Sequence, residues 1–226
     1  MTRRIAALAL AGFWLALAGG GAACANAPLL PPLFDDHAPQ PSLVFAYHGW
    51  RVNALPTARL RRATTTVRAI KAQIDLVEHL NLPPRVLDFM RSTPIAAELG
   101  APDERGRYLR GRGVVLNMRG LDDKRPALLE QLLYAYEDQV LPGGFANPDI
   151  GRLRREAAAL HVWPNAAAML HSDADYFAMV ASAYLYGAIT REPYTRADLH
   201  KTQPNAYRWL AGLFDNGVGR PDKPAG

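Results

Sequence analysis

The chain has 226 residues, which is enough for one domain with a sizeable hydrophobic core. Its 26 Lys and Arg residues and 21 Asp and Glu residues give a formal net charge of +5, and this mild excess, without a recognisable nucleic-acid-binding module, argues against a nucleic-acid partner. The single cysteine excludes an intramolecular disulfide, so an exported form of the chain must take its stability from the core.

Residues 1–25 have the features of a secretion signal. Arg3 and Arg4 form a positively charged start, the run 5–18 is almost wholly apolar, and Ala23 and Ala25 are the small residues that signal peptidase accepts. These features predict a signal peptide over 1–25, a mature chain that starts near Asn26, and export to the periplasm or the extracellular space. No later run reaches about 18 uninterrupted apolar residues, so we expect no transmembrane segment in the mature chain.

Cys24 offers a second way to process this signal. A lipoprotein signal ends in a box of small residues, and the cysteine that follows becomes the acylated first residue of the mature protein. The box here, Gly21-Ala22-Ala23, lacks the usual leucine, so simple cleavage is favoured over a lipid anchor at Cys24. The sequence leaves both routes open.

The next segments predict an extended leader, a strand and two helices. Residues 26–42 contain five prolines, which is typical of a Pro-rich extended segment. Ser42–Ala46 is a short apolar strand candidate. The stretch Ala58–Asn81 has apolar residues at helical spacing, which predicts an amphipathic helix, and a second helix is expected at Arg85–Ser92.

The middle of the chain predicts a small sheet and a central helix. Ile95–Leu99 and Val114–Met118 have the composition of strands, with glycines at the expected turns. Asp122-Asp123 is suited to cap a helix that takes Pro126 in its first turn and ends before the Pro-Gly-Gly sequence at 142–144.

The remainder of the chain is predicted to be helical up to a flexible end. Residues 215–226 are rich in Gly, Pro and charged residues, which predicts a flexible tail. The pattern as a whole predicts an α+β fold, mostly helical, in one domain over 43–214. The four further helices are expected at Ile150–Leu160, Asp173–Tyr186, Thr195–Lys201 and Pro204–Phe214.

The most informative motifs lie in two segments. Residues 128–144, LLEQLLYAYEDQVLPGG, combine a helix with a Leu-Pro-Gly-Gly turn, and residues 172–187, SDADYFAMVASAYLYG, form an aromatic helix. Together with His48-Gly49-Trp50 and the QIDLVE sequence at 73–78, they resemble the anthrax lethal factor-like family of secreted zinc metallopeptidases. The resemblance spans most of 43–214 and implies a zincin-like domain in which a small sheet lies beside the helix of the zinc motif.

The resemblance also implies that the zinc motif is degenerate. In this family an HExxH motif places two histidines on one helical face to bind zinc, and the glutamate acts as general base. The matching positions are Glu130, Gln131 and Tyr134, and the third ligand falls on Asp175. An amide such as Gln131 cannot accept a proton from water at neutral pH, so no catalytic residue is expected at these positions.

The same positions supply candidates for metal binding and for groove lining. Oxygen ligands alone suit zinc poorly, so we expect no metal, and a rearranged site would have to use Glu130, His171 and Asp175. Aromatic side chains could line a groove, although aromatics at helical spacing are more often core residues. The groove candidates are Tyr134, Tyr136 and Tyr176.

These observations favour a pseudoenzyme. The first hypothesis is an exported, noncatalytic relative of the metallopeptidases that keeps the groove for a peptide or protein partner and has no cofactor. The alternative is a hydrolase with a rearranged zinc site around Glu130, Tyr134, His171 and Asp175. A third possibility is a periplasmic structural factor whose groove has no function.

Overall fold

A computed structural model describes residues 42–58, 63–101, 104–119, 121, 124–164, 166–190 and 194–221. The predicted signal peptide with Cys24, and residues 26–41 of the predicted leader, lie outside these ranges. Within them, no helix combines the length and the apolar composition needed to cross a membrane.

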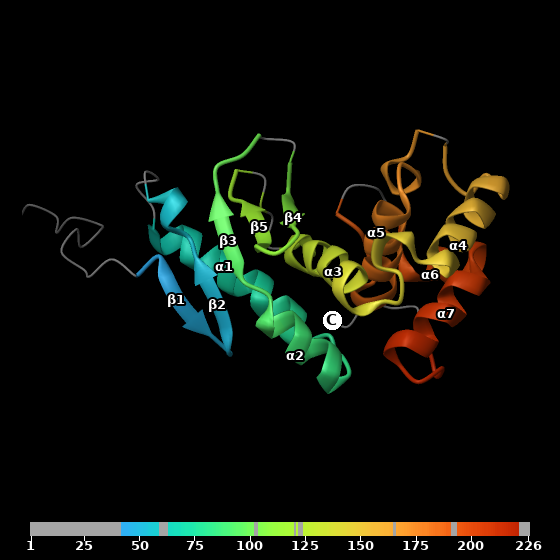
Figure 1. Ribbon diagram of the computed structural model, residues 1–226, viewed down its shortest axis with the longest axis horizontal. Coiled ribbons are helices and arrows are strands. Elements are labelled where there is room, and N and C mark those ends of the chain that lie inside the picture. Colours follow the sequence, from blue (N-terminus) through green and yellow to red (C-terminus); the bar gives the residue numbers. More distant parts are fainter. Residues whose placement is uncertain are drawn as a thin grey trace, which may run out of the picture. The chain divides into compact units, whose positions relative to one another are not determined.

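The sheet has five strands in the order β1-β2-β3-β5-β4 (Figure 1). The strands are β1 Val44–Tyr47, β2 Trp50–Asn53, β3 Ile95–Glu98, β4 Gly106–Leu109 and β5 Gly113–Asn117. β1 and β2 form a hairpin whose two turn residues, His48 and Gly49, have φ angles of 49° and 84°, as a tight turn between twisted strands requires. The central pairs β2-β3 and β3-β5 are parallel, and β4 returns antiparallel to β5 at one edge.

Where the structure describes them, the helices match the ranges expected from sequence to within a few residues; residues 59–62 near the predicted start of the first helix lie outside the described ranges. They are α1 Ala63–Glu78, α2 Pro84–Ser92, α3 Ala127–Val140, α4 Pro148–Ala159, α5 Asp173–Tyr186, α6 Arg196–Thr202 and α7 Pro204–Phe214. The strands predicted near β1, β3 and β5 are also present, whereas β2 and β4 were not predicted. The α+β fold with mostly helical content and a small sheet is confirmed.

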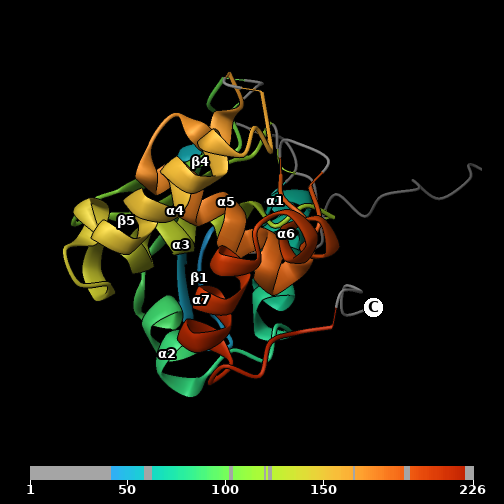
Figure 2. The ribbon, with the colours of Figure 1, turned by 90° about the vertical axis from the view of Figure 1, so that its right-hand side faces the viewer.

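Helix α3 lies between the sheet and the other C-terminal helices. It contacts β4 and β5 on one side and α5 on the other (Figure 1). Its leucines at 128, 129, 132 and 133 are fully buried, so the helix is packed nearly all round. In the view of Figure 2, α4 and α7 lie in front of the sheet, and α6 lies in front of α1. The prediction of a small sheet beside the Glu130-containing helix is therefore confirmed.

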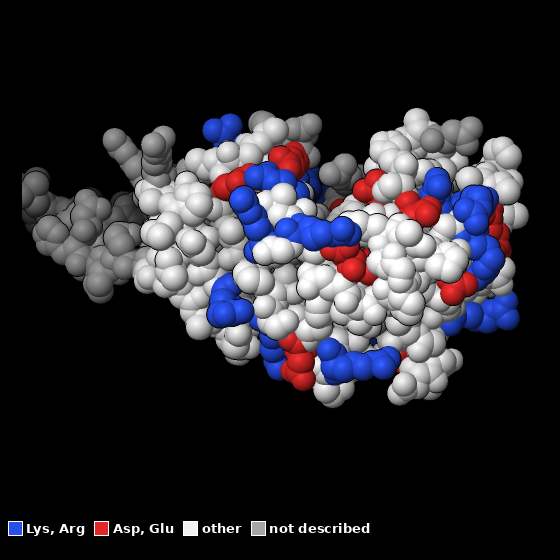
Figure 3. Space-filling model, in the orientation of Figure 1, with Lys and Arg blue, Asp and Glu red and all other residues white. Residues whose placement is uncertain are grey.

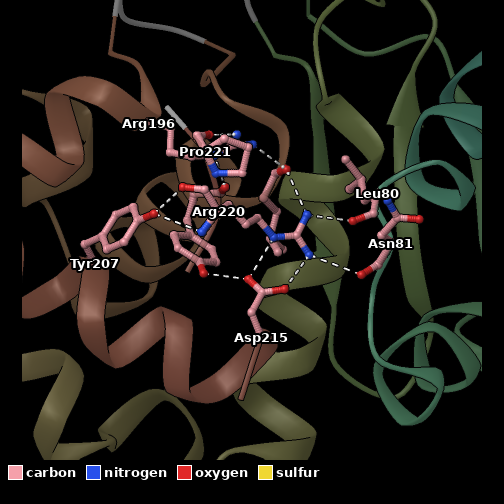
Figure 4. A network of polar contacts seen from close by, with 9 residues as sticks. Leu80, Asn81, Arg196, Tyr207, Asp215, Arg220 and Pro221 are labelled. Atoms are coloured by element: carbon pink, nitrogen blue, oxygen red, sulfur yellow. Dashed lines mark hydrogen bonds and ion pairs between the residues drawn. The ribbon is translucent and has the colours of Figure 1, made fainter. Parts of the chain in front are cut away.

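The segment after α7 is tied to the domain by two arginines (Figure 4). Arg220 forms an ion pair with Asp215 at 2.8 Å and donates hydrogen bonds to the carbonyl oxygens of Leu80 and Asn81 at 2.6 and 3.2 Å. The buried Arg196 donates to the Pro221 carbonyl oxygen at 2.5 Å. Residues 215–221, which the sequence assigns to a flexible tail, are thus anchored by these contacts, and 222–226 lie outside the described ranges.

Candidate functional site

A side chain of α1 forms hydrogen bonds with backbone groups at the start of helix α3. The predicted cap at Asp122-Asp123 lies outside the described residues, and Pro126 precedes the first helical residue without a side-chain cap. The Gln73 amide takes over this role, because its oxygen accepts from the Leu128 backbone N–H at 3.0 Å and its nitrogen donates to the Arg125 carbonyl at 2.7 Å. This contact fixes the first turn of α3, and with it the positions of Glu130, Gln131 and Tyr134.

A pocket of about 500 Å³ opens above this part of α3. The pocket is lined by all four positions that the sequence resemblance aligns with a zinc motif, which are Glu130, Gln131, Tyr134 and Asp175. Residues 130 and 134 are four apart on a helix and so share one face. The other lining residues come from β4 and its turn, from the segment after α3, and from α5: Gly106, Arg107, Tyr108, Arg110, Phe145 and Ala174.

Asp175 and Tyr134 are hydrogen-bonded to each other across the pocket. The Tyr134 hydroxyl donates to Asp175 Oδ1 at 2.6 Å, and the Ser172 hydroxyl donates to Oδ2 at 2.7 Å. Ser172 is also the N-cap of α5, because its hydroxyl oxygen accepts from the Asp175 backbone N–H at 3.0 Å. The cap and the tyrosine together fix the orientation of this carboxylate.

Glu130 and Gln131 form the buried floor of the pocket. Glu130 accepts a hydrogen bond from the Thr190 hydroxyl, and both α3 residues are buried. Gln131 lies under β4 at Gly106, where a Cβ would be 2.7 Å from the Val115 carbonyl oxygen and 3.3 Å from Gln131 Cγ. The contact with Val115 would be a clash with the backbone of β5, so only glycine fits at this position of β4.

The rim of the pocket is a connected set of polar and aromatic side chains. Tyr108 donates to Asp138 at 2.8 Å, and Arg110 binds the same carboxylate through two guanidinium nitrogens. The Arg110 guanidinium therefore holds the pKa of Asp138 below its usual range, and the Tyr108 hydrogen bond acts in the same direction. Phe145 packs edge-on against Tyr108 and lies 5.5 Å from the Arg110 guanidinium. These contacts join β4 to the turn that follows α3.

Glu137 is a second unusual group on α3, one turn beyond Tyr134. Its side chain is fully buried, and neither carboxylate oxygen has a hydrogen-bond partner among the described residues. Burial raises the pKa of Glu137 to about 8, and the nearby carboxylates Asp173, Asp138 and Asp175 add to the effect. The carboxyl is therefore largely protonated at neutral pH.

The structure corrects two of the three groove candidates. Tyr134 lines the pocket, but Tyr136 lies in the core against Phe89 and Phe214. Tyr176 is also buried, and its hydroxyl donates to Gln203 at 2.7 Å. Both tyrosines are core residues because they lie on faces of α3 and α5 that are turned away from the pocket.

The side chains at the pocket do not fit a zinc ion. His171 is exposed and is not among the pocket-lining residues, so the lining contains no imidazole. Glu130, Tyr134 and Asp175 offer only oxygen atoms, which bind zinc less well than nitrogen or sulfur ligands. Within the ranges that the structure describes, no group of three or more His, Cys, Asp or Glu side chains is placed to hold a metal.

Several residues of the pocket were not singled out from sequence. Tyr108, Arg110 and Phe145 come from β4, its turn and a short 3-10 segment, which are separated from α3 in sequence and reach it only through the tertiary fold. The Pro-Gly-Gly turn at 142–144 was the one available signal for Phe145, since it ends α3 and directs the chain back toward the pocket.

The chain shows similarity to known proteins at the level of structure and not of sequence families. No protein-family model matches the chain, and no curated protein sequence matches it. Among solved structures it is similar to the Pro-Pro endopeptidase from Paenibacillus alvei, with a TM-score of 0.47 and 21% sequence identity over 67% of this chain and 90% of that one. This degree of similarity assigns no activity to the chain.

Proposed function

We propose that this chain is an exported, noncatalytic relative of the lethal factor-like metallopeptidases that binds an extended peptide or protein segment in the pocket above α3. The observation that carries the proposal is where the side chains of Glu130, Gln131, Tyr134 and Asp175 lie and what they bond to. They line one open pocket, and the polar groups at its centre bond to neighbouring side chains, as Tyr134 does to Asp175 and Thr190 to Glu130.

The edge of the sheet supports a peptide as the ligand. β4 is an edge strand, and no other strand in the described part of the chain pairs with its far side. An edge strand offers backbone N–H and C=O groups to which an extended segment can add. Since Gly106, Arg107 and Tyr108 of β4 also line the pocket, an added segment would place its side chains there.

The chemistry of α3 supports binding without cleavage. Gln131 stands at the position of the general base, and an amide cannot take a proton from a water nucleophile at neutral pH. The alternative hydrolase needs His171 as a nitrogen ligand, but this exposed residue is not among those lining the pocket. Neither observation favours the hydrolase.

A pocket-blocking variant tests the proposal. Ala174 lines the pocket on the first turn of α5, so Ala174→Trp should fill it with an indole ring. Ala159→Trp places the same side chain on an exposed position at the end of α4 and serves as the matched control. Fluorescence anisotropy with a library of extended peptides should show binding to the natural and control proteins and at least about tenfold weaker binding to the blocked one.

The proposal fails if no peptide in the library binds the natural protein. It also fails if Ala174→Trp and Ala159→Trp bind peptides equally well, because the binding surface would then lie elsewhere on the protein.

A further inference from the structure

We infer that the peptide bound in this pocket carries a lysine or arginine side chain whose positive end lies at Asp175. This inference rests on the proposed function and names the class of peptide for the same site. It follows from a comparison of the rim arginines, which are paired with carboxylates, with Asp175, for which the described residues supply no ion pair.

The two arginines at the rim do not make the pocket positive. Arg107 forms ion pairs with both Glu98 and Glu104, so one positive charge is shared between two carboxylates. Arg110 is bound through two nitrogens by Asp138. Figure 3 shows the same arrangement over this part of the surface, where basic side chains lie beside acidic ones. Each rim arginine is thus matched by at least one carboxylate.

Asp175 differs from these paired groups. Its carboxylate accepts hydrogen bonds from the hydroxyls of Tyr134 and Ser172, and both of these donors are neutral. No ion pair with Asp175 is found within the described ranges. The carboxylate lines the pocket and is partly exposed, so a ligand cation can reach it. A charge that is hydrogen-bonded but lacks a counter-ion in a partly enclosed site attracts a cation.

The shape of the pocket suits a long basic side chain. The side chains of a segment added to β4 alternate between the two faces, so every second one points toward α3. A lysine or arginine has an apolar stem that can pack on ring surfaces while its charged end reaches further. The rings of Tyr134 and Phe145 line the pocket and can contact such a stem.

Three peptides that differ at one residue test this inference. The residue expected to enter the pocket is lysine, norleucine or glutamate, since norleucine keeps the apolar stem without the charge. Each peptide is titrated into the natural protein by anisotropy at low and at high salt. We expect the lysine peptide to bind about tenfold more tightly than the norleucine peptide, the difference to shrink at high salt, and the glutamate peptide to bind most weakly.

Substitution of Asp175 tests whether its carboxylate causes the preference for lysine. Asp175→Asn keeps an oxygen that can accept from Tyr134 and should remove the preference for lysine over norleucine. Asp149→Asn, at an exposed aspartate of α4 that does not line the pocket, should leave the preference unchanged. Circular dichroism of both variants confirms that they are folded.

The outcomes separate this inference from the proposed function. If the three peptides bind the natural protein equally well, peptide binding stands and the lysine preference is overturned. If Asp175→Asn keeps the full preference, Asp175 is not the recognising group. If no peptide binds, the proposed function is overturned, and this inference with it.

Discussion

The buried carboxyl of Glu137 should make the stability of this protein fall as the pH rises. Its pKa is about 8 in the folded protein, against an ordinary value of 4.5, because burial penalises the charged form and Asp173, Asp138 and Asp175 oppose a further negative charge. Between these two values the folded protein keeps the proton while the unfolded chain releases it. The contribution of Glu137 to stability is therefore complete below pH 4.5, decreases as the pH rises, and has been lost above pH 8.

The magnitude follows from the gap between the two pKa values. Each pH unit corresponds to about 1.4 kcal/mol, so a gap from 4.5 to about 8 amounts to a loss of about 5 kcal/mol at most across this range. Glu137→Gln removes the titrating group while keeping a similar shape. The variant should lack this loss, so its stability relative to the natural protein should increase by several kcal/mol between pH 5 and pH 8.

Urea unfolding followed by circular dichroism at half-unit pH steps measures this difference. Glu156→Gln, at a partly exposed glutamate of α4 that receives a hydrogen bond from Asn205, controls for the substitution itself. A constant stability difference between Glu137→Gln and the natural protein from pH 5 to pH 8 would refute the reasoning, because it would mean that the carboxyl titrates alike in the folded and unfolded states.

Four further outcomes test the fold, the site and the processing. Leu132→Ala should lower the free energy of unfolding by about 2 to 5 kcal/mol, since the side chain is fully buried. A loss below about 0.5 kcal/mol in urea melts would show that α3 does not bury this side chain. Arg220→Met should cost about 3 kcal/mol because it removes the ion-pair partner of Asp215 and leaves, among the described residues, only the Tyr184 hydroxyl bonded to this carboxylate, and unchanged melts would show that the tail is not anchored. Mass spectrometry of the exported protein should find a mature start at Asn26 or a lipidated Cys24, and an intact Met1 would contradict export. A variant with a rebuilt HExxH motif and third ligand combines Glu130→His, Gln131→Glu, Tyr134→His and Asp175→Glu. In a zinc titration it should bind one zinc at submicromolar concentration while the natural chain binds little, and equal affinities would contradict the degenerate site.

Local signals in the sequence predict the helices well. α5 starts at the cap residue Ser172 and ends at Gly187, whose φ of 106° suits a left-handed C-cap, and α7 starts at Pro204. Each boundary is set by residues next to it in the chain, so the sequence places these helices correctly. The strands β2 and β4 have four residues each, and their pairing depends on partners that sequence patterns do not specify.

The residues of the pocket were predictable only in part, because sequence patterns report local structure and not tertiary packing. Glu130 and Tyr134 share one face of a helix, so their common position in the pocket follows from helical spacing. Tyr136 and Tyr176 were expected beside them, but only the packing of α3 against its neighbours decides which aromatic rings enter the core. The burial of Glu137 has no sequence signal, because it arises from tertiary contacts.

The central claim is that the pocket binds extended peptides and leaves them intact. The most direct measurement incubates the purified mature protein with an unbiased peptide library and follows, by mass spectrometry, both the peptides retained on the protein and the appearance of new peptide ends. We expect retained peptides and no new ends, with or without added zinc. New ends produced by the natural protein, and lost in the pocket-blocked Ala174→Trp variant, would contradict it.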